Sequence, residues 1–182
     1  MPVKKEPAQS AAPAVCGVCG VKAKKVERMT VENLLKGGSQ REIIDTQYYF
    51  CETPGCDVVY FSNETGQRFT KRVVRTRIGI KETQAPIPIC YCFDFTEGMV
   101  LDELLTMGHT TIPDLIKSRI EAGRCACEVK NPSGRCCLGE VIKAVNRLTK
   151  EREVLARGER AVELPSADAG IDPLHACCGP KE

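Results

Sequence analysis

Cysteine is the residue type that carries the most chemical potential in this sequence, because 12 of the 182 residues are cysteine and only 2 are histidine. Clustered cysteines form disulfides in oxidising compartments and bind metal ions in reducing ones. The first 15 residues lack the apolar core of a secretory signal, so we expect a cytoplasmic protein whose clustered thiols are metal ligands. For single positions, a buried free thiol is the competing interpretation.

Two short cysteine pairs in the first third of the chain have the spacing of zinc knuckles. Cys16-Gly-Val-Cys19 and Cys51-Glu-Thr-Pro-Gly-Cys56 are separated by 31 residues. In each pair a glycine lets the backbone turn, so that both sulfur atoms reach one ion at about 2.3 Å, as in tetrahedral structural zinc sites. The thiols of Cys16, Cys19, Cys51 and Cys56 therefore predict a structural zinc site.

A second group of cysteines has a spacing that suits a binuclear cluster better than a single zinc ion. It comprises Cys90-Tyr-Cys92, Cys125-Ala-Cys127 and the adjacent pair Cys136-Cys137. One intervening residue in an extended segment sends two thiols apart, and a four-thiolate [2Fe-2S] cluster is the common all-cysteine alternative to zinc. A turn over residues 131–134 can bring Cys127 beside Cys137, which opens a predicted helix. The flanking cations Arg124, Lys130 and Arg135 would steady an anionic cluster.

A third group lies near the end of the sequence, where Cys177 and Cys178 follow His175. Adjacent thiols do not chelate as a knuckle does, but soft ions such as Cu(I) accept two thiolates, and a nearby imidazole can assist. The competing interpretation, which we favour, is an exposed redox-labile pair without metal. We therefore expect neither tail cysteine to be a ligand of the two upstream sites.

The segments between the cysteines predict the elements that must position them. Residues 47–50 and 57–61 are predicted as short strands on either side of the second knuckle, followed by a turn over 62–66. Thr30 is predicted as the N-cap of a short helix over 31–36 that ends at Gly37-Gly38. The first part of the chain is thus expected to be zinc-ribbon-like.

Three helices are predicted in the second half of the chain. The first has Thr96 as its N-cap and ends at Gly108; the second starts at Thr111, whose spacing to Asp114 matches a capping box; the third runs over about 138–157. Apolar residues at helical spacing predict a core made of Met99, Val100, Leu104, Leu105, Leu115, Ile116, Ile120, Leu138, Val141, Ile142, Val145 and Leu148. This arrangement places the second cysteine group on loops at one end of a small bundle.

Composition and charge exclude several function classes. A net charge of +2, 5% aromatic residues and no Trp do not favour a nucleic-acid partner. No apolar run approaches the roughly 18 residues of a membrane-spanning helix.

Six cations between Arg68 and Lys81 favour a solvated edge strand, with docking of an acidic redox partner or nucleic acid as the alternative. Phosphate loops, nucleophile elbows and His–carboxylate pairs do not occur, so the sequence indicates an electron-transfer or metal-chaperone-like protein rather than an enzyme.

These motifs resemble the N-terminal domain of archaeal and bacterial CopZ copper chaperones, and the second half is also similar to bacterioferritin-associated ferredoxin domains. The resemblance covers about residues 15–148. Besides the cysteine pairs of the first group, it depends on the segments Val58-Val-Tyr-Phe61, Pro88-Ile-Cys-Tyr-Cys92 and Asn131-Pro-Ser-Gly-Arg-Cys-Cys137. It implies zinc held by Cys16, Cys19, Cys51 and Cys56, and a [2Fe-2S] cluster held by Cys90, Cys92, Cys127 and Cys137, with Cys136 as a substitute and Cys125 as an extra thiol. The family's copper-carrying loop, approximately G-M-x-C-x-x-C, does not occur after Cys137.

We therefore expect an α+β protein with a flexible arm over 1–14, a β-rich zinc lobe over 15–85, a helical [2Fe-2S] lobe over 86–157 and a flexible tail over 158–182. The leading hypothesis is a redox metalloprotein of copper or soft-metal handling. Its cluster would transfer single electrons, reduce a metal ion such as copper to Cu(I), and serve a redox or metal-transfer protein partner. The alternatives are a ferredoxin-like electron carrier for another system and a redox-sensing partner-binding module.

Overall fold

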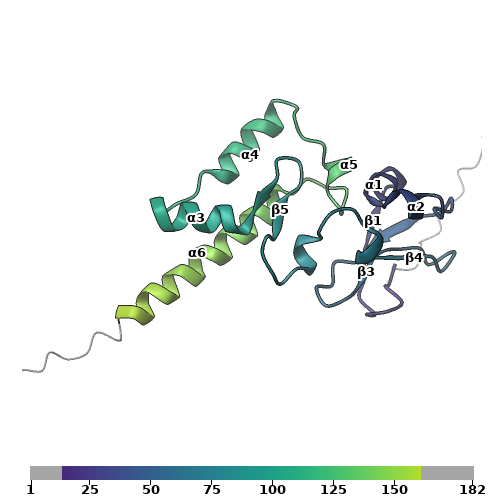
Figure 1. Cartoon of the computed structure of the whole chain (residues 1–182), viewed down its shortest axis with the longest axis horizontal. Helices are drawn as coiled ribbons and strands as arrows, with labels where there is room; N and C mark the ends of the chain where they lie inside the picture. The colour runs from purple at the N-terminus through teal and green to yellow at the C-terminus, as the bar shows by residue number, and fades with distance from the viewer. Residues whose placement is uncertain (1–13, 161–182) are drawn as a thin grey trace, which may run out of the picture. The chain divides into compact units, whose positions relative to one another are not determined.

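The computed structural model, which describes residues 14–160, confirms the α+β class (Figure 1). The chain divides into one unit that ends at Thr149 and a second unit that begins at Lys150. The first two cysteine groups both lie in the first unit. Among the described residues, no helix is long and apolar enough to cross a membrane.

A four-stranded antiparallel sheet forms the framework of the first part of the chain. Its strands are β1 (Lys24–Val26), β2 (Tyr48–Phe50), β3 (Val58–Phe61) and β4 (Arg68–Thr70), in that spatial order. Phe50 lies opposite Tyr60, and the β3–β4 register shifts between Val58 and Tyr60. Aromatic and β-branched residues fit such a pleated, half-buried surface. The strands predicted around the second knuckle are thus confirmed to within one residue.

Short helical segments connect and extend this sheet: α1 (Arg28–Leu34), α2 (Gly37–Gln40), and the 3-10 turns η1 (Lys71–Val73) and η2 (Gly79–Lys81). The predicted helix over 31–36 is wrong at both ends, because α1 begins before Thr30 and ends at Leu34. Thr30 is not an N-cap. Its buried hydroxyl donates a 2.6 Å hydrogen bond to the carbonyl of Glu128, a distant partner that local sequence does not reveal.

Helices dominate the second part of the described chain. A two-stranded sheet, β5 (Pro88–Cys90) and β6 (Phe95–Thr96), leads into α3 (Glu97–Met107), α4 (Ile112–Glu121), α5 (Cys127–Lys130) and α6 (Leu138–Arg160). Thr96 is the predicted N-cap of α3, and its hydroxyl accepts a hydrogen bond from the Met99 amide. The predicted capping box at Thr111 is wrong, because Thr111 instead binds the carboxylate of Glu103 on α3.

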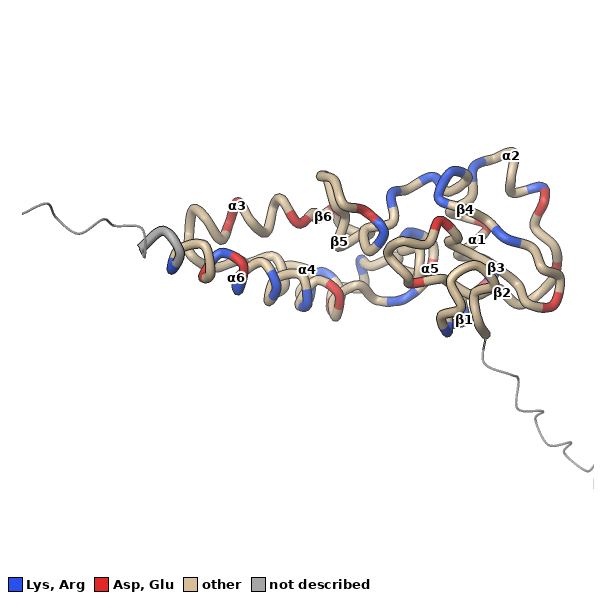
Figure 2. Tube along the Cα trace, turned by 90° about the horizontal axis from the view of Figure 1, so that it is seen from below, with Lys and Arg blue, Asp and Glu red and all other residues tan. Residues whose placement is uncertain are grey.

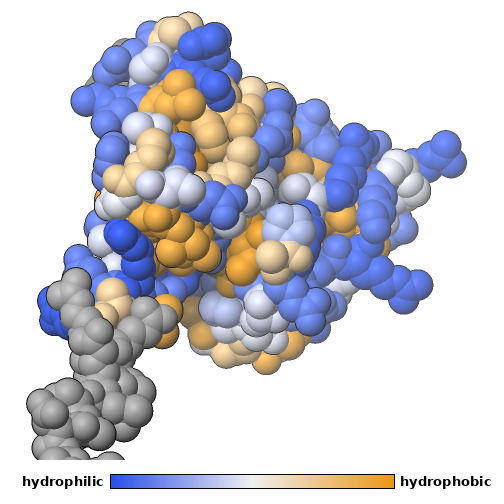
Figure 3. Space-filling view, turned by 60° about the vertical axis from the view of Figure 1, so that its left-hand side comes forward, coloured by the Kyte–Doolittle hydropathy of each residue, from blue (hydrophilic) through white to orange (hydrophobic). Residues whose placement is uncertain are grey.

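Buried side chains of these elements form two larger hydrophobic clusters. One packs α1 against the sheet and includes Val31, Leu35, Tyr48 and Tyr60. The other joins α3, α4 and α6 and also contains four cysteines of the second group. Four predicted core residues are exposed instead, namely Met99, Leu105, Leu115 and Ile142. Only one narrow face of each helix packs inward, so part of each predicted apolar stripe reaches the surface. Figure 2 shows charged residues recurring along α3, α4 and α6, and Figure 3 shows hydrophobic residues between hydrophilic ones on one face of the molecule.

The loop between α5 and α6 rests on the sheet part of the chain. Helix α1 packs against α5. The buried phenol of Tyr60 donates a 2.9 Å hydrogen bond to the carbonyl of Pro132. Gly134 has a φ of 67° and lies so close to Thr30 that a Cβ there would be 2.8 Å from the Thr30 hydroxyl. The loop that carries the last cysteines of the second group is therefore positioned by residues of the first part.

Candidate metal centre

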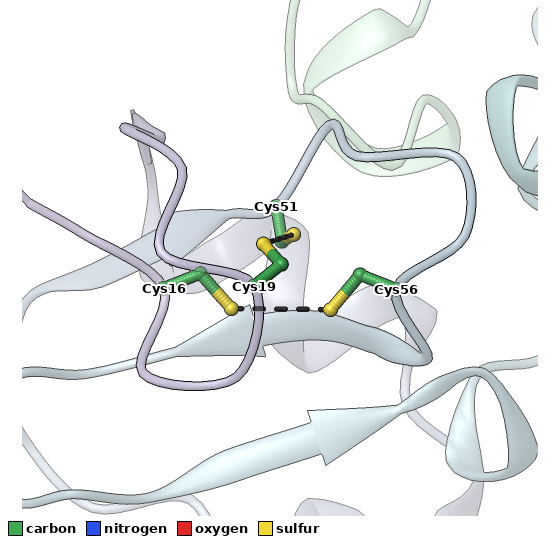
Figure 4. Close-up of side chains that lie close together, drawn as sticks. All are labelled: Cys16, Cys19, Cys51 and Cys56. Atoms are coloured by element: carbon green, nitrogen blue, oxygen red, sulfur yellow. Dashed lines mark hydrogen bonds between the residues drawn. The ribbon is translucent and has the colours of Figure 1, made fainter.

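The first cysteine group forms a compact centre of four sulfur atoms (Figure 4). Its two knuckles lie before β1 and between β2 and β3. All four Sγ atoms are within 4.8 Å of one another, with 4.0 Å between Cys16 and Cys56 and 3.7 Å between Cys19 and Cys51. Thiolates arranged tetrahedrally around zinc at about 2.3 Å are roughly 3.8 Å apart. The spacing therefore fits one tetrahedral ion.

Backbone hydrogen bonds shape each knuckle. In the first, the amide of Gly20 donates to the carbonyl of Cys16 (2.8 Å), which turns the chain between the two thiols. In the second, the amide of Cys51 donates to Val59 of β3 (2.9 Å), and the amide of Cys56 donates to Thr53 (3.2 Å). The sheet thereby fixes the second knuckle at its base, and local turns aim the sulfur atoms.

The thiols of this centre differ in acidity. A 3.2 Å hydrogen bond with the Thr53 hydroxyl lowers the pKa of Cys19 to about 6. Burial raises the pKa of Cys56 to about 12 and also raises that of Cys51. Thiolates are the form that binds zinc, so metal binding displaces protons from the buried thiols.

Four cysteines of the second group are buried and form two close pairs. Cys90 ends β5, Cys92 lies in the turn that follows, Cys127 begins α5 and Cys137 precedes α6. The Sγ atoms of Cys90 and Cys137 are 3.1 Å apart, and those of Cys92 and Cys127 are 3.3 Å apart. Within residues 14–160, only the first centre has at least three possible ligand atoms all within 4.8 Å of one another. The second group therefore does not converge on one point as the first does: its shortest sulfur contacts are Cys90–Cys137 and Cys92–Cys127, and Cys137 also interacts with Cys127.

Hydrogen bonds among these sulfur atoms shift the pKa values of the thiols in opposite directions. Bonds from the Cys137 thiol lower the pKa of Cys127 to about 5 and that of Cys90 to about 7, and they raise the pKa of Cys137 itself. Burial raises the pKa of Cys92 to about 12, although its sulfur accepts a 3.2 Å hydrogen bond from the Ala126 amide. The pKa is thus lowered for Cys90 and Cys127 and raised for Cys92 and Cys137.

The remaining cysteines lie apart from these buried sets. Cys125 and Cys136 are both exposed. Cys136 lines a cavity of about 460 Å³ together with Cys137 and Arg135. His175, Cys177 and Cys178 lie outside the described residues, so their predicted role stays a prediction.

Comparisons with known proteins agree with this geometry. The family model zf_CopZ, described as a zinc binding domain, matches residues 13–75. The copper chaperone CopZ of Archaeoglobus fulgidus is 37% identical over 123 residues, which are 67% of this chain and 57% of that protein. The chain thus spans somewhat more than half the length of this relative. The X-ray structure of the A. fulgidus CopZ N-terminal domain matches with a TM-score of 0.58 and 33% identity, covering 71% of this chain and 96% of that domain. The chain belongs to the CopZ N-terminal domain family.

The CopZ zinc-binding match contains all four cysteines of the first centre. The first part of the chain is therefore a CopZ-like zinc-binding domain with a four-cysteine group. The donor set supports zinc on its own chemistry, because four thiols at tetrahedral spacing are typical of structural zinc sites. The resemblance of the sequence motifs to the CopZ N-terminal domain is confirmed.

Sequence reasoning missed Lys81 as a neighbour of the CopZ-type zinc centre. The run of cations from Arg68 to Lys81 is not a uniformly solvated strand. Arg77 pairs with Glu82 at 2.7 Å, and the Lys81 side chain is buried against the second knuckle. No local pattern separates Lys81 from the other five cations, so only its tertiary contacts identify it.

Arg119 is a second residue that the sequence pattern did not single out. Its guanidinium lies 5.2 Å from the ring centre of Phe93 and 5.6 Å from that of Phe95, beside the hairpin that carries Cys92. Of the cations expected near the second group, Arg124 and Lys130 are exposed, and Arg135 donates to the carbonyl of Lys25. Helix α4, rather than the flanking loops alone, thus brings positive charge to this region.

Proposed function

We propose that this CopZ-type chain is a redox metalloprotein of copper or soft-metal handling, with zinc at the first centre and a [2Fe-2S] cluster at the second. The cluster ligands would be Cys90, Cys92, Cys127 and Cys137. The observation that carries the proposal is the close approach of these four buried thiols, with Cys90 next to Cys137 and Cys92 next to Cys127, because each iron of such a cluster takes two cysteine ligands. When bound, a [2Fe-2S] cluster supplies reversible one-electron transfer.

The protein residues around the second group would protect and tune such a centre. The apolar side chains of α3, α4 and α6 surround the cysteines and exclude water. The Ala126 amide donates to the Cys92 sulfur, and hydrogen bonds to cluster sulfurs influence the reduction potential. Arg119 adds a positive charge that favours an anionic centre.

The cavity lined by Cys136 and Cys137 supports access to this centre by a partner. Its lining includes charges of both signs, among them Arg135, Glu140 and Lys143. A reduced protein donor would supply one electron, and that electron would convert one Cu(II) ion to Cu(I) with the cysteines unchanged. The name of the A. fulgidus relative, a copper chaperone, supports copper as the metal and a metal-transfer protein as the partner.

Metal analysis of protein purified without oxygen tests the cofactor assignment. We expect about one zinc, two irons and two acid-labile sulfides per chain, and a red-brown colour. Cys90→Ala and Cys127→Ala should abolish the colour and leave zinc in place, whereas the control Cys125→Ala should keep both. Loss of zinc together with iron from the single changes would contradict two separate sites.

Copper reduction tests the functional half of the proposal. The chemically reduced protein, freed of excess reductant, should form one Cu(I) per cluster when mixed with Cu(II) and a Cu(I)-specific chromophore. The Cys90→Ala variant should form much less. A cluster that is reducible but forms no Cu(I) would contradict the copper role and favour a ferredoxin-like carrier for another partner.

A further inference from the structure

Lys81 is a buried charged side chain at the back of the first metal centre. Only 4% of its surface is exposed. Its Nζ donates hydrogen bonds of 2.7 Å to the carbonyl of Thr53 and 3.0 Å to the carbonyl of Cys56. Both carbonyls belong to the knuckle between β2 and β3, so the ammonium group contacts the backbone that carries two of the four thiols.

The charge of Lys81 has no carboxylate partner among the ion pairs of residues 14–160. An ammonium group is costly to bury unless an anion compensates it. The four thiolates of a zinc-loaded centre outnumber the two positive charges of the ion, so that centre is itself an anion. The net negative charge of the zinc-loaded centre therefore compensates the buried positive charge of Lys81.

We propose that Lys81 is the counter-ion and positioning residue of the four-cysteine zinc centre. It offsets part of the negative charge and holds the turn between Cys51 and Cys56 in its zinc-binding conformation. The proposal depends on zinc occupancy of the first centre and not on the [2Fe-2S] assignment.

The turn that presents Lys81 is held by the hydrophobic core and by a backbone hydrogen bond. Ile78, which is 1% exposed, anchors the turn in the core of the first part. The amide of Lys81 donates a 2.7 Å hydrogen bond to the carbonyl of Ile78. A cation on such a turn loses little conformational freedom when the ion binds.

The other cations of the run do not replace Lys81. The guanidinium of Arg68 lies beside Gly17 of the first knuckle, but Arg68 is exposed, and water screens its charge. Arg75 is exposed as well and donates to the carbonyl of Leu35, which is outside the centre. Charge interactions are stronger in the buried environment of Lys81 than at these surface positions.

Zinc competition on matched variants of the full chain tests the proposal. Lys81→Met removes charge and hydrogen bonds, Lys81→Gln keeps an amide donor without charge, and Lys81→Arg keeps both. Against a chromophoric chelator, we expect the Met and Gln variants to bind zinc about 10- to 100-fold more weakly, the range seen when outer partners of metal ligands are lost. Lys81→Arg should stay within a few-fold of the original protein, and Lys71→Met, from the same charge run, should match it.

A spectroscopic measurement separates the charge effect from simple damage to the fold. At saturating Co(II), the Lys81→Met protein should show the same tetrahedral thiolate bands as the original, because its four ligands are unchanged. Unchanged zinc affinity in Lys81→Met, full rescue by Lys81→Gln, or altered Co(II) bands would overturn the proposal. Iron analysis of the same samples reports separately on the second centre: iron-free protein with the expected zinc losses would refute the cluster and leave the role of Lys81 standing.

Discussion

The backbone amide of Gly79 donates a 2.8 Å hydrogen bond to the phenol oxygen of Tyr91. Tyr91 separates two cysteines of the second group, and Gly79 belongs to the same three-residue turn, η2, as Lys81. At one end this turn contacts the zinc knuckle, and at the other it contacts the cysteine hairpin. The two cysteine centres are thus joined by a short path through the fold.

A side chain at position 79 should disrupt this path, because it would overlap with the neighbouring backbone. A Cβ at this position would lie 1.9 Å from the carbonyl oxygen of Pro88, so the backbone must shift to admit it. We expect Gly79→Ala to lower the free energy of unfolding by about 1–3 kcal/mol, as overpacking does. Urea unfolding measures this. The control Gly37→Ala, which meets open space, should be close to neutral.

Removal of the Tyr91 hydroxyl should weaken the second centre selectively. Burial raises the pKa of Tyr91 to about 12, so its neutral phenol accepts the Gly79 hydrogen bond at physiological pH. Tyr91→Phe leaves that buried amide without its partner, and we expect iron to be released several-fold faster in air with zinc content unchanged. Absorbance decay follows the loss, with Tyr49→Phe as the control. Zinc loss without faster iron loss would contradict the expectation.

The hydroxyl of Thr30 should matter for stability because it binds across the two parts of the fold. Its hydrogen bond to Glu128 is 2.6 Å long and lies next to the loop that leads to Cys137. Thr30→Ala leaves a carbonyl without this donor and should cost about 1–3 kcal/mol of unfolding free energy in chemical denaturation. Thr106→Ala, on an exposed helix face, should stay within about 0.5 kcal/mol of the original protein.

Loss of a zinc ligand should unfold the first part of the chain more than the second. The binding energy of a structural zinc ion is also folding energy, so Cys16→Ser or Cys51→Ser removes both. We expect limited proteolysis to cut within residues 15–85 while the buried helical core around α3, α4 and α6 resists. An unchanged cleavage pattern after zinc chelation would refute the structural role of the ion.

The sequence beyond α6 should not supply ligands to either centre, since each already has four buried or half-buried thiols. Deletion of residues 161–182 leaves the described length of α6 in place, and we expect unchanged zinc and iron contents. A Cu(I) titration of intact and truncated protein against a chromophoric competitor then tests the tail. Equal uptake would discard Cu(I) binding by Cys177 and Cys178; iron loss on truncation would overturn the ligand assignment.

Sequence alone determined the features that depend on neighbours a few positions apart. The spacing of Cys16 with Cys19, and of Cys51 with Cys56, places each pair on one turn of backbone, and short-range hydrogen bonds close those turns. Thr96 likewise caps α3 through a residue three positions away. Such contacts depend on few neighbours, so the knuckles, the strands around them and the α+β class were predictable.

Tertiary structure decided every feature that joins distant segments. Cys90 meets Cys137 across 47 positions, and packing of the helical core leaves Cys125 and Cys136 exposed while four neighbours are buried. Thr30 resembles an N-cap in sequence but binds a carbonyl 98 residues away. Lys81 is one of six similar cations, yet it alone lies against the zinc knuckle with its charge buried. Burial and long-range pairing arise from how whole elements pack, and a local pattern does not contain that information.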